Sequence, residues 1–318
     1  LLGNGASMAI HPGFGYGSLR EAAENNGHIT PEVTEIFKAF DTTDFELVLR
    51  RLWEATLVNK ALGIEPGKVE QAYQQVRQAL IATVRDVHIS HSDAKKHLEP
   101  MYRFMKSFET VFCLNYDLLV YWAMMESQEE LTKWWFKDCF EKGGVFPEDW
   151  ESKRKKYGGA DGTTLVFYPH GSLITATLDD YAEAKIAAGG ENLLREILDR
   201  WEKGTAVPLF VSEGTTEHKK QSIARSSYLN RIFREALPNP GEALVIYGWS
   251  ISPQDSHILS QLRRKKTVPM RVAVSVYRGN QASAQQMEDT LRPAGIDEIY
   301  FFEAESPGCW IYPAESKQ

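Results

Sequence analysis

Three short segments of the chain combine residue types that could do chemistry. Residues 3–7 (GNGAS) form a glycine turn after an apolar pair, Asn115 and Asp117 follow a second apolar run, and His170 follows a third. Glycines let a backbone approach phosphate oxygens closely, and short polar side chains can orient a ligand. An imidazole with a near-neutral pKa can act as a general base. Taken in this order, the three segments predict one composite site.

Each segment also has a plainer interpretation. The glycines could form a tight turn without a ligand, and Asn115 and Asp117 could cap a helix that starts near residue 118. His170 could be a structural histidine. In an open parallel sheet, however, ligands bind outside the carboxyl ends of the strands, and His170 directly follows a predicted strand. Its position therefore favours a functional role.

A fourth candidate lies late in the chain. Gly248, Trp249 and Ser250 follow the apolar run 243–247 and precede a predicted helix at Pro253. A strand, a glycine, a hydroxyl side chain and a helix thus follow one another here. If the glycine turn at residues 3–7 binds one half of a dinucleotide, this second junction suits the other half. Trp249 could instead simply pack against its neighbours.

Other polar residues carry weaker signals. His88, His91 and His97 fall near a predicted helix end and lack the spacing of a metalloprotease motif, and the chain has no CxxC pair, so no metal is expected. Cys113 lies inside an apolar run and is interpreted as a small buried hydrophobe. Asp255 is expected to complement the dipole of the helix it begins, with His257 close behind it.

Composition narrows the class of protein. The 318 residues are 43% hydrophobic and 25% charged, as in an ordinary globular chain. The net charge of −7 argues against direct binding of nucleic acid, because phosphate binding needs a basic field. The basic runs 153–156 and 263–266 are interpreted as solvated. No apolar run is long enough to span a membrane and no signal peptide is visible, which predicts a chain without membrane attachment.

The three cysteines are odd in number and far apart, which predicts a reducing, cytoplasmic environment. Leu1 and Leu2 resemble the end of a buried strand, so the natural chain is expected to extend further at its N-terminus.

The apolar pattern predicts an α/β fold with a doubly wound, mostly parallel, Rossmann-like sheet in a single domain over residues 1–318. Short apolar runs predict strands at 111–114, 165–168, 207–211, 243–247, 271–276 and 298–302. Helical stretches are predicted between the later strands, at 217–236, 253–265 and 282–293.

Two segments interrupt this alternation. Residues 19–109 are predicted to form a helical module inserted between the first and second strands. Its helices are expected at 44–62, from Pro66 onward, and at 97–108. Residues 120–162 show no clear periodicity and predict a mostly irregular excursion.

The motifs taken together resemble the sirtuin family. The chain order is a GxGxS turn, Asn-x-Asp after a strand, His-Gly, and Gly-x-Ser after a late strand. The sequence is more similar to the bacterial sirtuin-like NADase domains of anti-phage defence, whose Asn-Tyr-Asp and His-Gly elements look like residues 115–117 and 170–171. Residues 44–46 (DFE) and 211–214 (VSEG) are also similar to segments of those domains.

The resemblance implies roles for individual residues. Asn115 and His170 would be catalytic, with Asn115 on the nicotinamide ribose or the attacking water and His170 as the base. Asp117 would contact the carboxamide, and Gly248 and Ser250 the adenosine side. The full NAD-binding set implied is Gly3, Asn4, Gly5, Ala6, Ser7, Asp117, Gly248, Trp249 and Ser250. NAD would be the substrate, and no metal is implied.

Two departures from the deacetylases shape the implied activity. The chain lacks their zinc ribbon, and residues 13–16 (GFGY) occupy the place of their Pro-x-Phe-Arg segment. Water is therefore implied as the acceptor, giving an NAD glycohydrolase that releases nicotinamide and ADP-ribose or a cyclic form.

The resemblance also implies that the activity of this NAD glycohydrolase is gated by a partner protein, a nucleotide signal, or homo- or hetero-oligomerisation. The enzyme would act in antiviral defence by abortive infection. A non-catalytic sensor of NAD or ADP-ribose is one alternative, and an ADP-ribosyltransferase or deacylase is another.

Overall fold

The computed structural model describes residues 1–15, 17–65, 67–156, 158–178, 182–211, 215–262 and 271–314. Predictions that involve Tyr16, Pro66, residues 212–214 and the basic run 263–266 lie outside the described residues. The described part of the chain is a mixed α/β fold in which parallel strands and helices alternate over much of its length.

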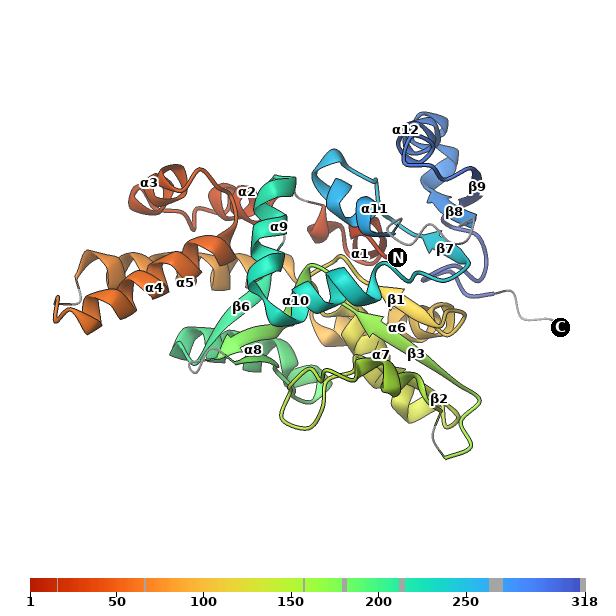
Figure 1. The fold of residues 1–318 in the computed structure, drawn as a ribbon, viewed down its shortest axis with the longest axis horizontal. Coiled ribbons are helices and arrows are strands. Elements are labelled where there is room, and N and C mark those ends of the chain that lie inside the picture. Colours follow the sequence, from red (N-terminus) through yellow and green to blue (C-terminus); the bar gives the residue numbers. More distant parts are fainter. Residues whose placement is uncertain are drawn as a thin grey trace.

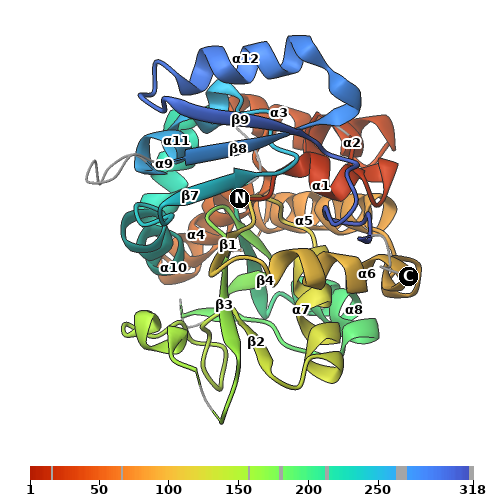
Figure 2. The ribbon, with the colours of Figure 1, turned by 90° about the vertical axis from the view of Figure 1, so that its right-hand side faces the viewer.

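Two small parallel sheets meet at the start of the chain. One has the order β1-β3-β2 and the other β7-β8-β9. Leu2 makes parallel bridges to Cys113, just after β1, and to Tyr247, just after β7. Figure 2 shows the N-terminus between β1 and β7. The strand bounds are β1 Thr110–Phe112, β2 Trp134–Lys137, β3 Gly162–Phe167, β7 Ala243–Ile246, β8 Arg271–Val276 and β9 Glu298–Glu303.

A third sheet is antiparallel, with the order β5-β4-β6. It consists of β4 (Gly171–Leu178), β5 (Glu183–Lys185) and β6 (Ala206–Phe210). The prediction that β6 belongs to the parallel sheet is therefore wrong. The cause is the tight turn after β3, where Gly171 has a φ of +74° and donates its N–H to the Tyr168 carbonyl, which reverses the chain without a crossover helix.

Helices fill the region between Leu2 and β1. After the short α1 (Asn4–Met8) come α2 (Leu19–Asn25), α3 (Pro31–Ala39), α4 (Phe45–Ala61), α5 (Lys68–Val87) and α6 (His91–Met105). Asp44 caps α4 by accepting from the N–H groups of Glu46 and Leu47, as its place before an apolar stripe predicts. Helices α4 and α5 form a long hairpin that reaches away from the sheets (Figure 1).

The region predicted as an irregular excursion, residues 120–162, is more regular than expected. It begins with α7 (Leu119–Glu130) and strand β2, so the prediction is wrong for this part. Residues 118–124 are all buried, and a helix that is apolar on every side has no amphipathic period to read. A 3-10 helix at Trp150–Arg154 and turns make up most of the remainder.

The C-terminal half adds α8 (Leu193–Lys203), α9 (Thr216–Arg225), α10 (Ser227–Arg231), α11 (Ser256–Leu262) and α12 (Gln281–Leu291). Buried side chains form two clusters. One joins the helical region to the antiparallel sheet, and the other lies among the parallel strands and the later helices. Among the described helices, none combines the length and apolarity that a bilayer span requires.

Candidate functional site

The carboxyl ends of adjacent parallel strands meet at one edge of the molecule. Leu2 leads into Gly3, β1 into Asn115, β3 into His170 and β7 into Gly248. A cavity of about 480 Å³ opens at this edge and is called the strand-end cavity below. The predicted residues that line it are Gly3, Asn4, Gly5, Asn115, His170, Gly248, Trp249 and Ser250. The structure thus brings both predicted catalytic residues and both glycine junctions to one space.

Three predicted ligand contacts lie behind the cavity wall. Ala6 is fully buried, and its carbonyl accepts from Nε1 of Trp310 at 2.8 Å. Ser7 and Asp117 are also buried and do not line the cavity. That these three residues contact a ligand directly stays a prediction, since they are buried behind the lining of the cavity. They support the wall.

Asn115 is fixed by a chain of hydrogen bonds. Its Nδ2 donates to the Gly3 carbonyl at 3.0 Å and to the Ser7 hydroxyl at 2.7 Å. The Ser7 hydroxyl in turn donates to a carboxylate oxygen of Asp117. Because a carbonyl can only accept, the Gly3 contact fixes which end of the amide is nitrogen. Both amide hydrogens are used, so the amide oxygen is the group that Asn115 can offer to a ligand.

Asp117 combines two supporting roles. One carboxylate oxygen holds Ser7, and the other accepts from the Leu119 N–H at 2.9 Å, at the start of α7. Burial raises the pKa of Asp117, and the hydrogen bonds from Ser7 and the Leu119 N–H oppose that rise. The helix-cap interpretation of Asp117 is the one that the structure shows. Both carboxylate oxygens accept hydrogen bonds within the protein, and the contact with a carboxamide stays a prediction.

The two glycine junctions pack against each other. The Gly5 N–H donates to the Gly248 carbonyl at 2.7 Å. A Cβ on Gly3 would lie 2.5 Å from Cβ of Trp249, and a Cβ on Gly248, whose φ is +67°, would lie 2.3 Å from the Ala6 nitrogen. Glycine is therefore required here by contact between backbones. The Gly5 N–H, which the sequence pattern offers to a phosphate, is already used within the protein.

His170, which also lines the strand-end cavity, is held in a polar cluster. Its carbonyl accepts from the Val211 N–H at 2.6 Å, and its Nε2 lies 2.9 Å from Nε2 of His257. Burial lowers the pKa of His170 to about 3, and the carboxylate of Asp255 opposes this shift. His170 is therefore a neutral imidazole at physiological pH, which is the form that a general base needs.

Sequence reasoning missed three members of this cluster as site residues. Lys219 on α9 and Asp255 both line the cavity, and the Lys219 ammonium lies 2.7 Å from the Asp255 carboxylate. Nε1 of Trp249 donates to the other carboxylate oxygen at 3.2 Å, and buried His257 completes the group. The position of Asp255 and His257 just after the second junction was an available signal. Lys219 gave none, because only tertiary packing carries α9 to this edge.

His170, Asp255 and His257 also form a potential metal-ligand set. One ligand atom from each lies within 4.8 Å of the others, a grouping found once among the described residues. The carboxylate already binds Lys219 and Trp249, and the two imidazole nitrogens face each other directly. A divalent ion would have to replace these contacts.

A second space, called the side cavity, adjoins the first. It has a volume of about 380 Å³ and shares Gly5, Met8, Gly248, Trp249 and Ser250 with the strand-end cavity. Hydroxyl groups and aromatic rings supply much of the remaining wall, from Ser275, Tyr277, Ser283 and Tyr312. The second glycine junction therefore separates two adjoining cavities.

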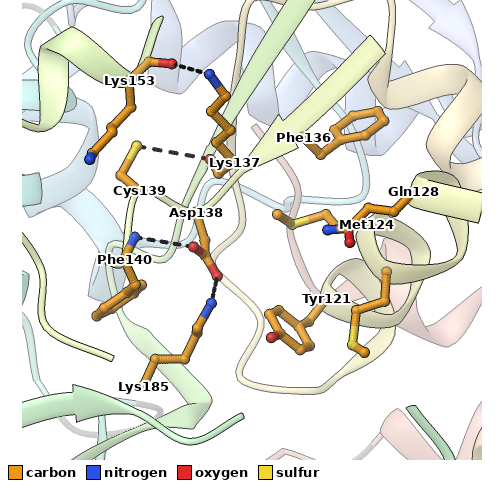
Figure 3. Close-up of a pocket in the computed structure, with 11 residues that line it drawn as sticks. Tyr121, Met124, Gln128, Phe136, Lys137, Asp138, Cys139, Phe140, Lys153 and Lys185 are labelled. Atoms are coloured by element: carbon orange, nitrogen blue, oxygen red, sulfur yellow. Dashed lines mark hydrogen bonds and ion pairs between the residues drawn. The ribbon is translucent and has the colours of Figure 1, made fainter. Parts of the chain in front are cut away.

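A third cavity, of about 210 Å³, lies between α7, β2 and β5 and is shown in Figure 3. It is called the lysine cavity, after Lys137, Lys153 and Lys185 in its wall. Nζ of Lys185 lies 2.6 Å from Asp138, and Nζ of Lys137 donates to the Lys153 carbonyl at 2.8 Å. Burial raises the pKa of Cys139 to about 12, so its thiol stays protonated. None of the predicted site residues lies here.

Comparison with known proteins places the chain in a family. Residues 1–310 match the sequence model of a family described as "Domain of unknown function (DUF4917)", and the chain belongs to this family. No curated protein matches the sequence.

Proposed function

We propose that the chain is an NAD glycohydrolase that cleaves the bond between nicotinamide and ribose. The observation that carries this proposal is the shared cavity of Asn115 and His170, which lie 55 positions apart and follow different strands. The products are nicotinamide and ADP-ribose, or a cyclic form of it. NAD is a substrate in this scheme, and no metal takes part.

The strand arrangement supports a dinucleotide ligand. Read through Leu2, the two parallel sheets give the order β2-β3-β1, Leu2, β7-β8-β9. We interpret this as a doubly wound, Rossmann-like sheet whose strand order reverses at Leu2. Ligands of such sheets bind at the carboxyl edge where the order reverses, and the strand-end cavity opens there.

The adjoining cavities suit the two halves of NAD. The nicotinamide ribose fits the strand-end cavity, between Asn115 and His170. The adenosine half fits the side cavity, where Tyr277 and Tyr312 offer rings and Ser275 a hydroxyl. Each cavity is within the range of about 300–1,000 Å³ that is usual for small-molecule sites.

The chemistry needs few groups from the protein. Nicotinamide leaves as a neutral molecule from a cationic precursor, so no acid has to protonate it. The amide oxygen of Asn115 can hold a ribose hydroxyl or the attacking water, and neutral His170 can accept the proton that this water loses. The buried walls limit water near the oxocarbenium-like transition state.

We further propose that this activity is gated, because unrestrained NAD cleavage would harm the host cell. A partner protein, a nucleotide signal or oligomerisation would serve. The resemblance to sirtuin-like defence effectors suggests a cytoplasmic protein that depletes NAD during phage infection and thereby acts by abortive infection.

A sensor that binds NAD or ADP-ribose without cleaving it is the second candidate. It is favoured by the low pKa of His170, about 3 because of burial, which makes the free imidazole a weak base. A sensor retains nicotinamide on the bound nucleotide, whereas a glycohydrolase releases it. An ADP-ribosyltransferase or deacylase would instead pass ADP-ribose to protein or to an acyl group.

The test is product analysis after incubation with NAD, with the chain alone and with candidate activators. We expect free nicotinamide with ADP-ribose or its cyclic form, and a loss of turnover of about 10²–10⁴-fold in both Asn115→Ala and His170→Ala. Gln128→Ala, on the exposed part of the lysine cavity, is the matched control and should leave turnover unchanged. Equal rates in the wild type and both site variants would falsify the assignment.

A further inference from the structure

His170 in the wall of the strand-end cavity pairs with the buried His257, which the scheme above does not use. Nε2 of His170 and Nε2 of His257 are 2.9 Å apart, and the ring centroids are 5.1 Å apart with an interplanar angle of 26°. The nitrogens therefore face each other along the line that joins the two rings. Both side chains are buried, so this is a direct hydrogen bond between imidazoles.

The position of the hydrogen in the pair decides whether His170 can act as a base. One Nε2 must carry the hydrogen and the other must accept it. If His170 donates, its Nδ1 holds a lone pair and can take a proton from a substrate. If His257 donates, Nδ1 of His170 already carries hydrogen and the ring cannot act as a base. A base at position 170 therefore requires His257 as the acceptor.

The charged groups around the pair act on its protonated form in opposite directions. Asp255 stabilises positive charge on both rings, whereas Lys219 opposes it for both and Lys220 opposes it for His257. Asp255 is held in place by Lys219 and by Trp249. This carboxylate is the negative charge that offsets a proton gained by the pair.

We propose that His257 is a positioning residue that orients His170 as the base and accepts its Nε2–H while Nδ1 takes the reacting proton. The proposal rests on the glycohydrolase function. In the step, the water oxygen bonds to C1′ of the ribose and one water proton moves to Nδ1 of His170. The bond from C1′ to nicotinamide breaks, its electron pair stays on the nicotinamide nitrogen, and His170 later returns the proton to solvent.

The same geometry argues against a metal at this position. Ligands of one ion direct their lone pairs to a common point, whereas the two Nε2 atoms here point at each other. The two oxygens of Asp255 also already accept from Lys219 and Trp249.

The experiment compares His257→Phe, which keeps a ring but no nitrogen, with His257→Gln, which keeps a hydrogen-bond acceptor. We expect His257→Phe to lower kcat by about 10–100-fold with little change in KM for NAD, and His257→Gln to recover part of the loss. The acid limb of the kcat profile should move to lower pH in His257→Phe, because His170 loses the acceptor that stabilises its protonated form. His97→Gln, on helix α6, is the matched control.

A second measurement detects the hydrogen bond between His170 and His257 without an activity assay. In protein labelled with ¹⁵N-histidine, NMR should show the N–H proton of the pair in the wild type and in His97→Gln, and its loss in His257→Phe. An active wild type with unchanged kcat in His257→Phe overturns the positioning role alone. Activity that requires Zn²⁺ or Mn²⁺ and vanishes with a chelator overturns it in favour of a metal site. A wild type that releases no nicotinamide with any activator overturns the glycohydrolase function and this role with it.

Discussion

The strand-end cavity and the lysine cavity differ in how they use their polar groups. In the lysine cavity, Lys185 pairs with Asp138 and Lys137 donates to backbone carbonyls, so both ammonium groups are bound within the protein. In the strand-end cavity, Asn115 has both hydrogens fixed and its oxygen available, and His170 has one nitrogen fixed by His257. In a cavity suited to chemistry, hydrogen bonds within the protein thus hold each polar side chain in place and leave one of its polar atoms available to a ligand.

The supporting layers differ as well. Behind Asn115 stand Ser7 and Asp117, and behind the histidine pair stand Asp255 and Lys219. These residues are placed by elements far apart in the sequence. The ion pair of the lysine cavity instead joins two residues that both line the cavity, Asp138 just after β2 and Lys185 at the end of β5.

The largest effect is expected where the two glycine junctions touch. Gly248→Ala would place a side chain at a φ of +67° and 2.3 Å from the Ala6 nitrogen, so the free energy of unfolding should fall by about 4 kcal/mol. Thermal and urea unfolding measure this. Gly189→Ala is the control, because Gly189 has a φ of −61° and open space around it, and should change stability by about 0.5 kcal/mol at most. Equal effects at both positions would contradict the close packing of the junctions.

Breaking the ion pair of the lysine cavity should lower the free energy of unfolding and leave NAD cleavage unchanged. Asp138→Ala leaves the Lys185 ammonium without its partner in a mostly buried position and should cost about 3 kcal/mol. NAD cleavage per folded molecule should stay at the wild-type rate at a temperature where the variant is folded. A loss of turnover beyond the folded fraction would show that the lysine cavity takes part in catalysis.

Acid should weaken the histidine side of the strand-end cavity. Burial lowers the pKa of His170 to about 3 and of His257 to about 4, whereas an unfolded histidine titrates near 6.5. The unfolded chain therefore binds more protons below pH 6.5, so this contribution is complete above pH 6.5 and declines as the pH falls toward 4. Between pH 7 and 5 each histidine of the pair should lower the free energy of unfolding by about 2 kcal/mol.

A double variant, His170→Gln with His257→Gln, isolates this contribution. Buried Glu46, whose pKa burial raises to about 8, gives the opposite slope in the same pH range. The histidine effect is therefore the difference in slope between the wild type and the double variant, measured by urea unfolding. Parallel slopes would mean that the pair is not buried as neutral imidazoles.

The smallest effect is expected behind Asn115. Ser7→Ala removes the hydroxyl that links Asn115 to Asp117, and should cost about 1–2 kcal/mol of stability and lower turnover about 10-fold. Ser92→Ala, at an exposed serine on α6, is the control. Turnover in Ser7→Ala equal to that of the control would show that Asn115 needs no support from this chain of hydrogen bonds.

Patterns with strong local signals were predictable. The strands β1, β3, β7, β8 and β9 follow from short apolar runs, and Asp44 ahead of an apolar stripe marked the start of α4. The start of α7 was not predictable from its period, because residues 119–124 are buried on all sides and show no polar face. The antiparallel pairing of β6 was missed, because it follows from one turn at Gly171 and not from the composition of β6.

By itself, the sequence determined which residues end the parallel strands, and therefore which polar groups gather at one edge: Asn115, His170 and the junctions at Gly3 and Gly248. Only the tertiary structure decided what each group faces. It placed Ser7 and Asp117 behind the wall, set the glycines against each other, and carried Lys219 and His257 to His170. The physical reason is that strand ends are fixed by local hydrophobic periodicity, whereas hydrogen-bond partners are fixed by long-range packing, which no local pattern encodes.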